Sequence, residues 1–411
     1  MGKLIGGLLG FWIGGIGLAI IGLIIGHVFD TGYSQLQAQL RPNPEQKKKI
    51  QDSFFKTVFL LLGHLAKADG RVSEEEVKQA ENFMSQMGLT TEHRREAINL
   101  FKQGSDSSRS MQGKSIALLF FNPSLRTRTS FELGAFQMGG HAVVLQPGKD
   151  AWPMEFELGT TMDGEAEEHV KEAAQVLSRY CDLIAVRAFP KFTDWEQDRQ
   201  DKTLMAFSQY ATVPVINMET IIHPCQELAL MMNLQEKLGQ PDKKKFLLTW
   251  TWHPKPLNTA VANSALLIAS KFGMDVTLLC PSPEYLLDER FMQAGAENAK
   301  REGGSLTVTH DIQEAYSGAD FVYAKSWGAL PYFGRWEEET GIRMASRHFM
   351  VDAQKIALTN SAKFSHCLPL RRNVKATDEV MDADYCVAID EAENRLHVQK
   401  AMMATLLENQ Q

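Results

Sequence analysis

The sequence is poor in cysteine, and none of its cysteines is spaced for a metal or redox site. The chain has 411 residues and five widely separated cysteines without a CxxC pair: Cys181, Cys225, Cys280, Cys367 and Cys386. This pattern argues against a disulfide framework and structural zinc, and it favours a reducing cytosol. The chain also lacks a GxGxxG fingerprint, so we expect neither a metal nor an organic cofactor.

The chain has no excess of positive charge. Its formal net charge is -7, which disfavours a nucleic-acid partner because phosphates would be repelled. The composition, 44% hydrophobic and 23% charged, is typical of a globular protein, and the length allows two or three cores. A small-molecule enzyme fits this composition better than a nucleic-acid-binding protein.

One long apolar run stands at the start of the chain. Residues 4–28 could cross the hydrocarbon core of a membrane as one helix, so we interpret residues 1–30 as a transmembrane anchor. Only Lys3 precedes the run and several cations follow it, which places the bulk of the chain in the cytoplasm, tethered to the inner membrane. A cleaved signal peptide is the alternative, although no small-x-small cleavage site follows the run.

Residues 45–104 have a helical pattern. A hydrophobic stripe begins at Phe54, and Ser73 with Glu76 forms a capping box. The stretch "FFKTVFLLLGHLAKADGRVSEEEVKQAENFMSQMGL", after "IGHVFD", resembles the start of membrane-anchored DnaJ-like co-chaperones and part of their TerB-like helical domain. The His-Pro-Asp tripeptide of a J-domain does not occur in the sequence.

From residue 110 the pattern changes to alternating strands and helices, which is typical of α/β folds with doubly wound parallel sheets. Strands are predicted over residues 114–121, 182–189, 213–218, 245–252, 275–281, 321–325 and 363–368. Polar residues gather at their carboxyl ends, where ligands bind in such sheets. These residues are Arg187, Glu219, His223, Gln226, Lys325 and the segment 366–369.

The polar segment "NPSLRTRTS" lies between the first of these strands and a helical stretch predicted over residues 131–138. Free backbone N–H groups, the positive end of a helix dipole and two arginines, Arg126 and Arg128, together suit a phosphate. The alternative is an ordinary helix cap with two solvated arginines.

Several segments resemble N-acetylornithine carbamoyltransferases of the aspartate/ornithine carbamoyltransferase superfamily. They are "SLRTRTSFELGAFQMGGHAVVLQPGKDAWP", "HPCQELA", "HPKPLNTAVANS", "YAKSWGALPYF" and "HCLPLRRNVKATDEVMD". The resemblance implies two parallel-sheet domains, with carbamoyl phosphate bound by residues 110–222, an acylornithine bound by residues 223–390, and residues 391–411 as a helix returning to the first domain. The family opens with a helix of its own, and residues 92–103 are the candidate replacement.

The resemblance also implies the residues that bind carbamoyl phosphate. Those of the phosphate loop and its cover are Ser124, Leu125, Arg126, Thr127 and Trp152, with Trp152 reaching a neighbouring subunit of a homotrimer. Those around the carbamoyl group are Arg187, His223, Pro224, Cys225, Gln226, Cys367, Leu368 and Arg395. Arg126, Arg187 and His223 would be catalytic.

For the acceptor, the resemblance implies contacts from Glu219, Lys325 and Leu370. Glu167 matches a glutamate near the acyl group of the acetyl-specific enzymes, where a carboxylate tolerates a neutral acetyl cap but repels a succinyl carboxylate. Lys375 matches a lysine that is carboxylated in members of this family, so the resemblance implies a modified lysine here. The expected function is transfer of a carbamoyl group to N-acetylornithine in arginine synthesis. The alternatives are an N-succinylornithine enzyme and a membrane-tethered interaction protein whose transferase part is inactive.

Overall fold

A computed structural model describes residues 110–408, and residues 1–109 and 409–411 lie outside the described part. The predicted anchor at residues 4–28 and the helical segment at 45–104 therefore stay predictions. Within residues 110–408, no helix combines the length and apolar character needed to cross a membrane.

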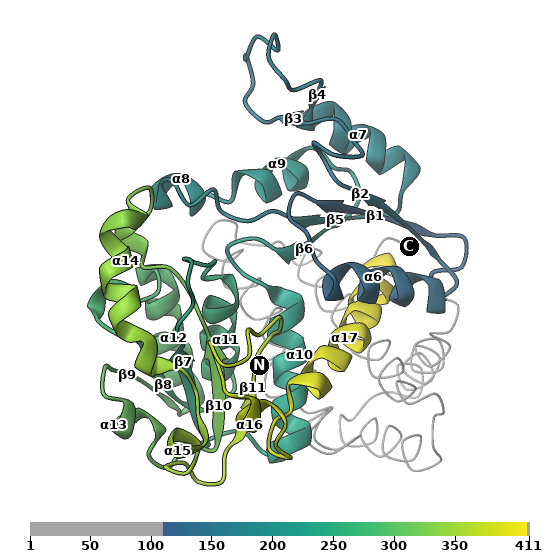
Figure 1. The fold of residues 1–411 in the computed structure, drawn as a ribbon. Coiled ribbons are helices and arrows are strands. Elements are labelled where there is room, and N and C mark those ends of the chain that lie inside the picture. The colour runs from purple at the N-terminus through teal and green to yellow at the C-terminus, as the bar shows by residue number, and fades with distance from the viewer. Residues whose placement is uncertain (1–109, 409–411) are drawn as a thin grey trace, which may run out of the picture. The chain divides into compact units, whose positions relative to one another are not determined.

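The first sheet has four strands in the order β2-β1-β5-β6 (Figure 1). They are β1 (Ser115–Phe120), β2 (His141–Leu145), β5 (Leu183–Arg187) and β6 (Val215–Glu219). β1 and β5 are parallel with Ile116 opposite Leu183, and β5 and β6 are also parallel. The helices that lie between these strands in the sequence are α6 (Arg126–Gln137), α7 (Val170–Tyr180), α8 (Trp195–Asp198) and α9 (Lys202–Tyr210).

The second sheet has five strands in the order β11-β10-β7-β8-β9, all paired in parallel. They are β7 (Lys245–Trp250), β8 (Asp275–Leu279), β9 (Ser305–Thr309), β10 (Phe321–Lys325) and β11 (Lys363–Ser365). Its longer helices are α10 (Pro224–Leu238), α11 (Ala260–Lys271), α12 (Glu289–Glu302) and α14 (Trp336–Ala345). The pairings of β1 with β5 and of β5 with β6 in the first sheet, and all the pairings of the second sheet, are parallel. The α/β fold class is confirmed.

Short elements and one long helix complete the described chain. β3 (Met154–Glu155) and β4 (Glu168–His169) pair beside α7. The remaining helices are α13 (Ile312–Tyr316), α15 (Ala353–Ile356), α16 (Asp378–Met381) and α17 (Ala388–Glu408), and the 3-10 turns are η2 (Pro283–Tyr285), η3 (Leu330–Tyr332) and η4 (Ser346–Phe349).

The seven predicted strands are confirmed. The sequence indicates them clearly because buried parallel strands are continuously apolar. The prediction missed β2 and β9, which lie at sheet edges and are partly exposed, and the two-residue strands β3 and β4. The first helix begins at Arg126, five residues before the predicted start at Phe131. The polar segment after β1 therefore supplies the first turn of α6 as well as the approach to it.

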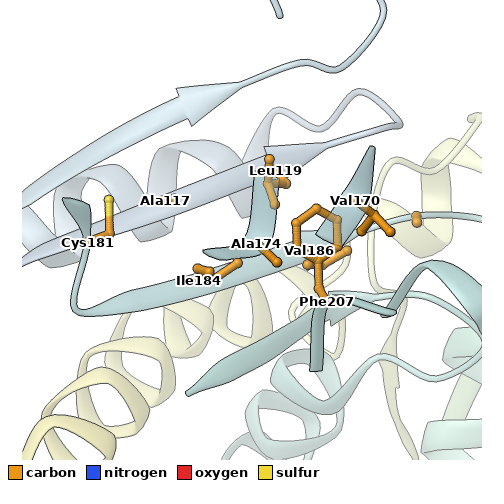
Figure 2. Packing of buried hydrophobic residues seen from close by; sticks show 9 residues of the cluster. Ala117, Leu119, Val170, Ala174, Cys181, Ile184, Val186 and Phe207 are labelled. Atoms are coloured by element: carbon orange, nitrogen blue, oxygen red, sulfur yellow. The ribbon is translucent and has the colours of Figure 1, made fainter. Parts of the chain in front are cut away.

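Figure 2 shows the apolar cluster on one face of the first sheet, formed by Ala117, Leu119, Val170, Ala174, Cys181, Ile184, Val186, Ala188 and Phe207. The β1 and β5 members alternate along their strands, so they point to the same face, where α7 and α9 cover them. The fully buried Phe207 contributes about 2 kcal/mol or more by leaving water. This packing anchors the strands whose carboxyl ends carry the polar residues.

The chain divides into two compact units. One holds residues 115–132 and 142–398, with both sheets apart from the first residue of β2. Residues 110–114, 133–141 and 399–408 belong to the other unit, within which Met111 N donates to Met138 O at 3.0 Å and Lys400 Nζ to Gln137 Oε1 at 3.3 Å. All the polar contacts of the site described below lie within the first of these units.

Candidate functional site

The first part of the site is the start of α6. Ser124 Oγ accepts a hydrogen bond from Thr127 N at 3.1 Å, so the serine caps the helix. Arg126 is half-buried, and burial lowers its pKa, with Arg395, Arg187 and Glu219 among its charged neighbours. Arg128 instead pairs with Glu132 at 3.2 Å on the exposed side. Only one of the two arginines therefore faces the other site residues.

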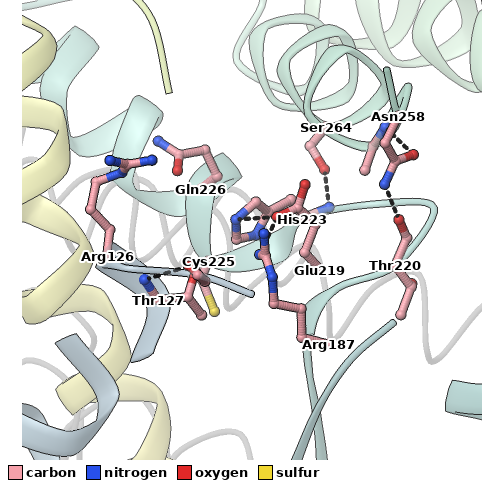
Figure 3. Close-up of polar contacts among 12 residues, drawn as sticks. Arg126, Thr127, Arg187, Glu219, Thr220, His223, Cys225, Gln226, Asn258 and Ser264 are labelled. Carbon is pink, nitrogen blue, oxygen red and sulfur yellow. Dashed lines mark hydrogen bonds and ion pairs between the residues drawn. The ribbon is translucent and has the colours of Figure 1, made fainter. Parts of the chain in front are cut away.

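The carboxyl ends of β5 and β6 bring together Arg187, Glu219 and His223 (Figure 3). Arg187 donates from Nη1 to Glu219 Oε2, and His223 Nε2 lies 3.4 Å from the same oxygen. The Arg187 guanidinium also lies over the ring of Phe189, 4.5 Å from its centroid. All three polar side chains are buried. The Glu219 carboxylate thus offsets the positive charge of Arg187 and keeps the Arg187 and His223 side chains close together.

His223 is neutral at physiological pH. Burial lowers its pKa well below the usual 6.5, and the positive charges of Arg395, Arg187, Lys325 and Arg126 lower it further. These four cations outweigh the single contact with Glu219. A neutral imidazole keeps one nitrogen as a donor and the other as an acceptor, so it can orient a polar ligand without adding charge.

The loop that carries His223 is fixed by residues at and just before α11. Ser264 Oγ accepts from His223 N at 2.8 Å, Asn263 Nδ2 donates to Ile221 O at 2.9 Å, and Asn258 Nδ2 donates to Thr220 O at 2.7 Å. These donors and acceptors belong to the segment "HPKPLNTAVANS", but no role was predicted for any of them. The sequence does carry a signal for this support: polar side chains in a buried, alanine-rich helix need hydrogen-bond partners, and a nearby loop can supply them.

Arg395, from α17, joins the start of α10 to the α6 turn. Its Nη1 donates to Gln226 Oε1 at 2.7 Å and its Nη2 to Thr127 Oγ1 at 2.8 Å. Gln226 lies in the first turn of α10, after Pro224 and the fully buried Cys225. The structure therefore brings together three residues that are far apart in sequence, all of them predicted site residues.

A second cluster lies beyond β10 and β11. Lys375 Nζ lies 3.3 Å from His366 Nε2, and burial together with the charge of Lys325 lowers the Lys375 pKa to about 7. His366 Nδ1 accepts from Leu368 N at 2.8 Å, where the Leu368-Pro369 peptide is cis and Leu368 has a φ of 51°. Cys367 is buried and Leu370 is half-buried.

Three buried nitrogens of the site have no hydrogen-bond partner within residues 110–408. They are Arg187 Nε, His223 Nδ1 and Arg395 Nε. Buried polar groups are rarely left unpaired, and those that are call for an explanation such as a ligand. Guanidinium groups with a neutral imidazole suit an anion with a polar carbonyl, because arginine binds phosphate through fixed N–H groups and imidazole can donate to an oxygen.

Two predicted site residues are not brought to this cluster by their own chain. Trp152 is 65% exposed and Glu167 is exposed, both between α6 and α7. In the described part of the chain, no hydrogen bond or ion pair joins either side chain to the cluster. Glu167 N donates to Pro153 O at 3.3 Å, which ties the two ends of the loop together.

Two family models match the chain with this arrangement. The aspartate/ornithine carbamoyltransferase carbamoyl-P binding domain matches residues 77–236, and the Asp/Orn binding domain of the same family matches residues 248–406. The chain belongs to the aspartate/ornithine carbamoyltransferase family. The first match begins within residues 45–104, the segment predicted to be TerB-like. The model of the co-chaperone DjlA transmembrane domain matches residues 1–36.

Individual members of the carbamoyltransferase family are also similar to the chain. The N-acetylornithine carbamoyltransferase of Xanthomonas campestris pv. campestris is 69% identical over 310 residues, which is 75% of this chain and 91% of that protein. That of Xylella fastidiosa is 67% identical over 298 residues, 72% of this chain and 89% of that protein. The N-succinylornithine carbamoyltransferase of Bacteroides fragilis is 36% identical, over 72% of this chain and 89% of that protein.

Solved structures of the same family share the fold. Acetylornithine transcarbamylase complexed with acetylcitrulline has a TM-score of 0.72 and 61% identity, covering 83% of this chain and 97% of that chain. A mutant N-acetyl-L-ornithine transcarbamylase, with proline in place of a glutamate, is complexed with carbamyl phosphate and N-succinyl-L-norvaline. It has the same TM-score and identity and covers 83% of this chain and 98% of that chain.

The neutral state of His223 predicts a pH-dependent stability difference between the wild type and His223→Gln. The unfolded histidine takes up a proton below about pH 6.5, whereas the folded one resists it. As pH falls below that value, the wild type should lose free energy of unfolding relative to the variant by up to about 1.4 kcal/mol per pH unit.

Urea unfolding of both proteins at several pH values measures this difference. Between pH 7 and 8.5 it should stay constant, which serves as the internal control. A constant difference down to pH 5 would show that His223 is protonated in the folded protein.

Proposed function

We propose that the chain transfers the carbamoyl group of carbamoyl phosphate to the side-chain amine of N-acetyl-L-ornithine, giving N-acetyl-L-citrulline and phosphate. The observation that carries this proposal is the cluster of the buried Arg187, His223, Gln226 and Arg395 with the half-buried Arg126, in which three nitrogens have no partner. The 69% identity to an N-acetylornithine carbamoyltransferase supports the acetylated acceptor. Such a reaction belongs to arginine synthesis.

The phosphate would bind at the start of α6. Backbone N–H groups of Ser124, Leu125 and Arg126 lie at or just before the first turn, where the helix dipole favours negative charge. Thr127, whose N–H donates to Ser124 Oγ, would contribute its hydroxyl. The Arg126 side chain supplies a charge-assisted bond, and Arg395 is held beside the turn by Thr127. Phosphate is then neutralised as it leaves.

The carbamoyl group would lie between the carboxyl ends of β5 and β6. Arg187, and His223 with its proton on the unpartnered Nδ1, would donate to its carbonyl oxygen, which becomes an oxyanion when the amine attacks. Gln226 would orient its NH2 group. Backbone groups of Cys367 and Leu368 would limit the space on the other side, and Pro224 and Cys225 would place the start of α10.

No separate base is needed in this mechanism. The amine nitrogen bonds to the carbonyl carbon, the bond from that carbon to the phosphate oxygen breaks, and the departing phosphate takes the amine proton. The protein contributes by holding the amine and the carbonyl carbon in contact. For the acceptor, Glu219, Lys325 and Leu370 would contact the acylated amino acid, since all three lie at or beyond strand ends.

The site would be completed by a neighbouring subunit of a homotrimer. Leu125 is 77% exposed and Trp152 is 65% exposed, although both belong to segments of the proposed carbamoyl-phosphate site. Contact with a second copy of the chain would remove this apolar surface from water. We assign residues 110–222 to the carbamoyl-phosphate domain, 223–390 to the acylornithine domain and 391–411 to the returning helix.

The chain would be held at the inner membrane with its catalytic part in the cytoplasm. The apolar run at residues 4–28 and the match of a transmembrane-domain model to residues 1–36 support an anchor. A TerB-like segment at residues 45–104 would connect it to the transferase.

A citrulline assay on the full-length chain in mild detergent tests the function. With carbamoyl phosphate present, N-acetylornithine should give turnover with the highest kcat/KM of three acceptors, the others being ornithine and N-succinylornithine. The reason is that Glu167 tolerates a neutral acyl cap. A preference for N-succinylornithine would identify the succinyl enzyme, and no turnover with any amine would favour the inactive interaction protein.

The acyl preference should change in Glu167→Pro. Removing the carboxylate removes a like-charge repulsion against the succinyl group, so the ratio of kcat/KM for N-succinylornithine to N-acetylornithine should rise by about tenfold or more. A solved relative in which proline replaces a glutamate binds N-succinyl-L-norvaline. Glu165→Pro, in the same exposed loop, is the matched control; an unchanged ratio in Glu167→Pro would contradict the assignment.

Lys375 should carry a carbamate formed with carbon dioxide. Its pKa of about 7 leaves much of the buried amine neutral at physiological pH, and only a neutral amine attacks CO2, forming an N–C bond and releasing a proton. The new negative charge would lie near Lys325. Labelling with 13C-bicarbonate should give a carbamate resonance by NMR that Lys375→Arg lacks, and its absence from the wild type would refute the modification.

A further inference from the structure

Glu391 is a fully buried carboxylate that the proposed mechanism does not use. It lies in the first turn of α17, one helical turn before Arg395. Its Oε1 accepts from Tyr323 Oη at 2.9 Å and from Gln226 Nε2, and its Oε2 accepts from Ser365 Oγ. A buried carboxylate is costly unless its oxygens are hydrogen-bonded, and here three donors meet it.

The side-chain amide of Gln226 is held from both ends. Its nitrogen donates to Glu391, whereas its oxygen accepts from Arg395 Nη1 at 2.7 Å. An ionised carboxylate can only accept and a guanidinium can only donate. Turning the amide over would place oxygen against oxygen and N–H against N–H, so these two side chains permit one orientation only while Glu391 is ionised.

This orientation matters for the group that Gln226 faces. The amide oxygen has two lone pairs, of which Arg395 occupies one. The other is available to accept an N–H from a ligand. Carbamoyl phosphate carries such an NH2 group, while acetyl phosphate has a methyl group of nearly the same size in its place.

We propose that Glu391 is a positioning residue that fixes the Gln226 amide with its oxygen toward the carbamoyl NH2, and so selects carbamoyl phosphate over acetyl phosphate. The inference rests on the proposed function. Burial raises the pKa of Glu391 to about 7, whereas its three hydrogen-bond donors and the charge of Arg395 favour the ionised form. At pH 8.5 the carboxylate is therefore ionised and acts only as an acceptor.

Glu391→Gln tests this role. The carboxamide can donate as well as accept, so the Gln226 amide can turn over and lose its bond to the carbamoyl NH2. Selectivity is measured as the ratio of the acetyl phosphate inhibition constant to the carbamoyl phosphate KM. Because only carbamoyl phosphate loses a hydrogen bond, this ratio should fall by about tenfold, which corresponds to one hydrogen bond to a buried group. The inhibition constant of inorganic phosphate, which has no NH2 group, should stay within about twofold on the same argument.

Two comparisons separate positioning from loss of stability. Glu339 is also fully buried and accepts from a tyrosine, Tyr285 Oη, at 2.7 Å, so Glu339→Gln is the matched control and should keep the selectivity. In a Gln226→Met background, Glu391→Gln should leave the ratio unchanged, because no amide remains to be oriented. Glu391→Asp keeps the charge but is too short to reach Gln226, and it replaces Glu391→Gln if that variant does not fold.

Failure of the Glu391 role and failure of the proposed transferase function give different results. Absence of wild-type turnover would overturn the transferase assignment before the selectivity is measured. Wild-type turnover with equal selectivity in the wild type and Glu391→Gln would overturn the role of Glu391 alone. An equal loss in Glu339→Gln, or in the Gln226→Met background, would show that the effect is structural.

Discussion

The guanidinium of Arg395 is almost wholly buried, and a charge in that place is tolerable only where neighbouring oxygens accept its N–H groups. Thr127 and Gln226 provide two of these oxygens. One comes from the turn after β1 of the first sheet, and the other from α10, which follows β6. The hydrogen bonds therefore hold the α6 turn and the start of α10 to the same side chain. The proposed phosphate and carbamoyl contacts depend on this arrangement.

The concentration of positive charge explains several other properties of the site. Burial lowers the pKa of both His223 and Lys375; the charges of Arg395, Arg187, Lys325 and Arg126 lower that of His223 further, and Lys325 lowers that of Lys375 further. This cluster of positive charge would attract a substrate that carries a doubly charged phosphate. Glu219 neutralises part of the charge through Arg187. Each pKa shift is thus a consequence of gathering several cations in a buried position.

Parallel strands account for how distant segments meet. Arg187 and Glu219 end the neighbouring strands β5 and β6, and the α6 turn follows β1, which pairs with β5. Because these parallel strands lie side by side and end at the same edge of the first sheet, residues far apart in sequence converge there. Lys325 ends β10 of the second sheet. Asn258, Asn263 and Ser264 then fix the one loop that carries His223. Rigid support of this kind fits the catalytic role proposed for His223, since small displacements of catalytic groups reduce rates strongly.

Local patterns in the sequence were enough to predict the α/β class, seven of the strands and the polar residues at the strand ends, because buried apolar runs and the polar residues that follow them are visible without a fold. These patterns did not reveal the edge strands β2 and β9, whose exposure weakens the apolar signal. Nor did they reveal that Arg128 faces away from Arg126, or that Glu391 holds Gln226. Residues 226 and 391 lie 165 positions apart, and only the packing of α17 beside α10 decides that one orients the other. Hydrogen bonds between distant side chains depend on tertiary geometry, which no local pattern specifies.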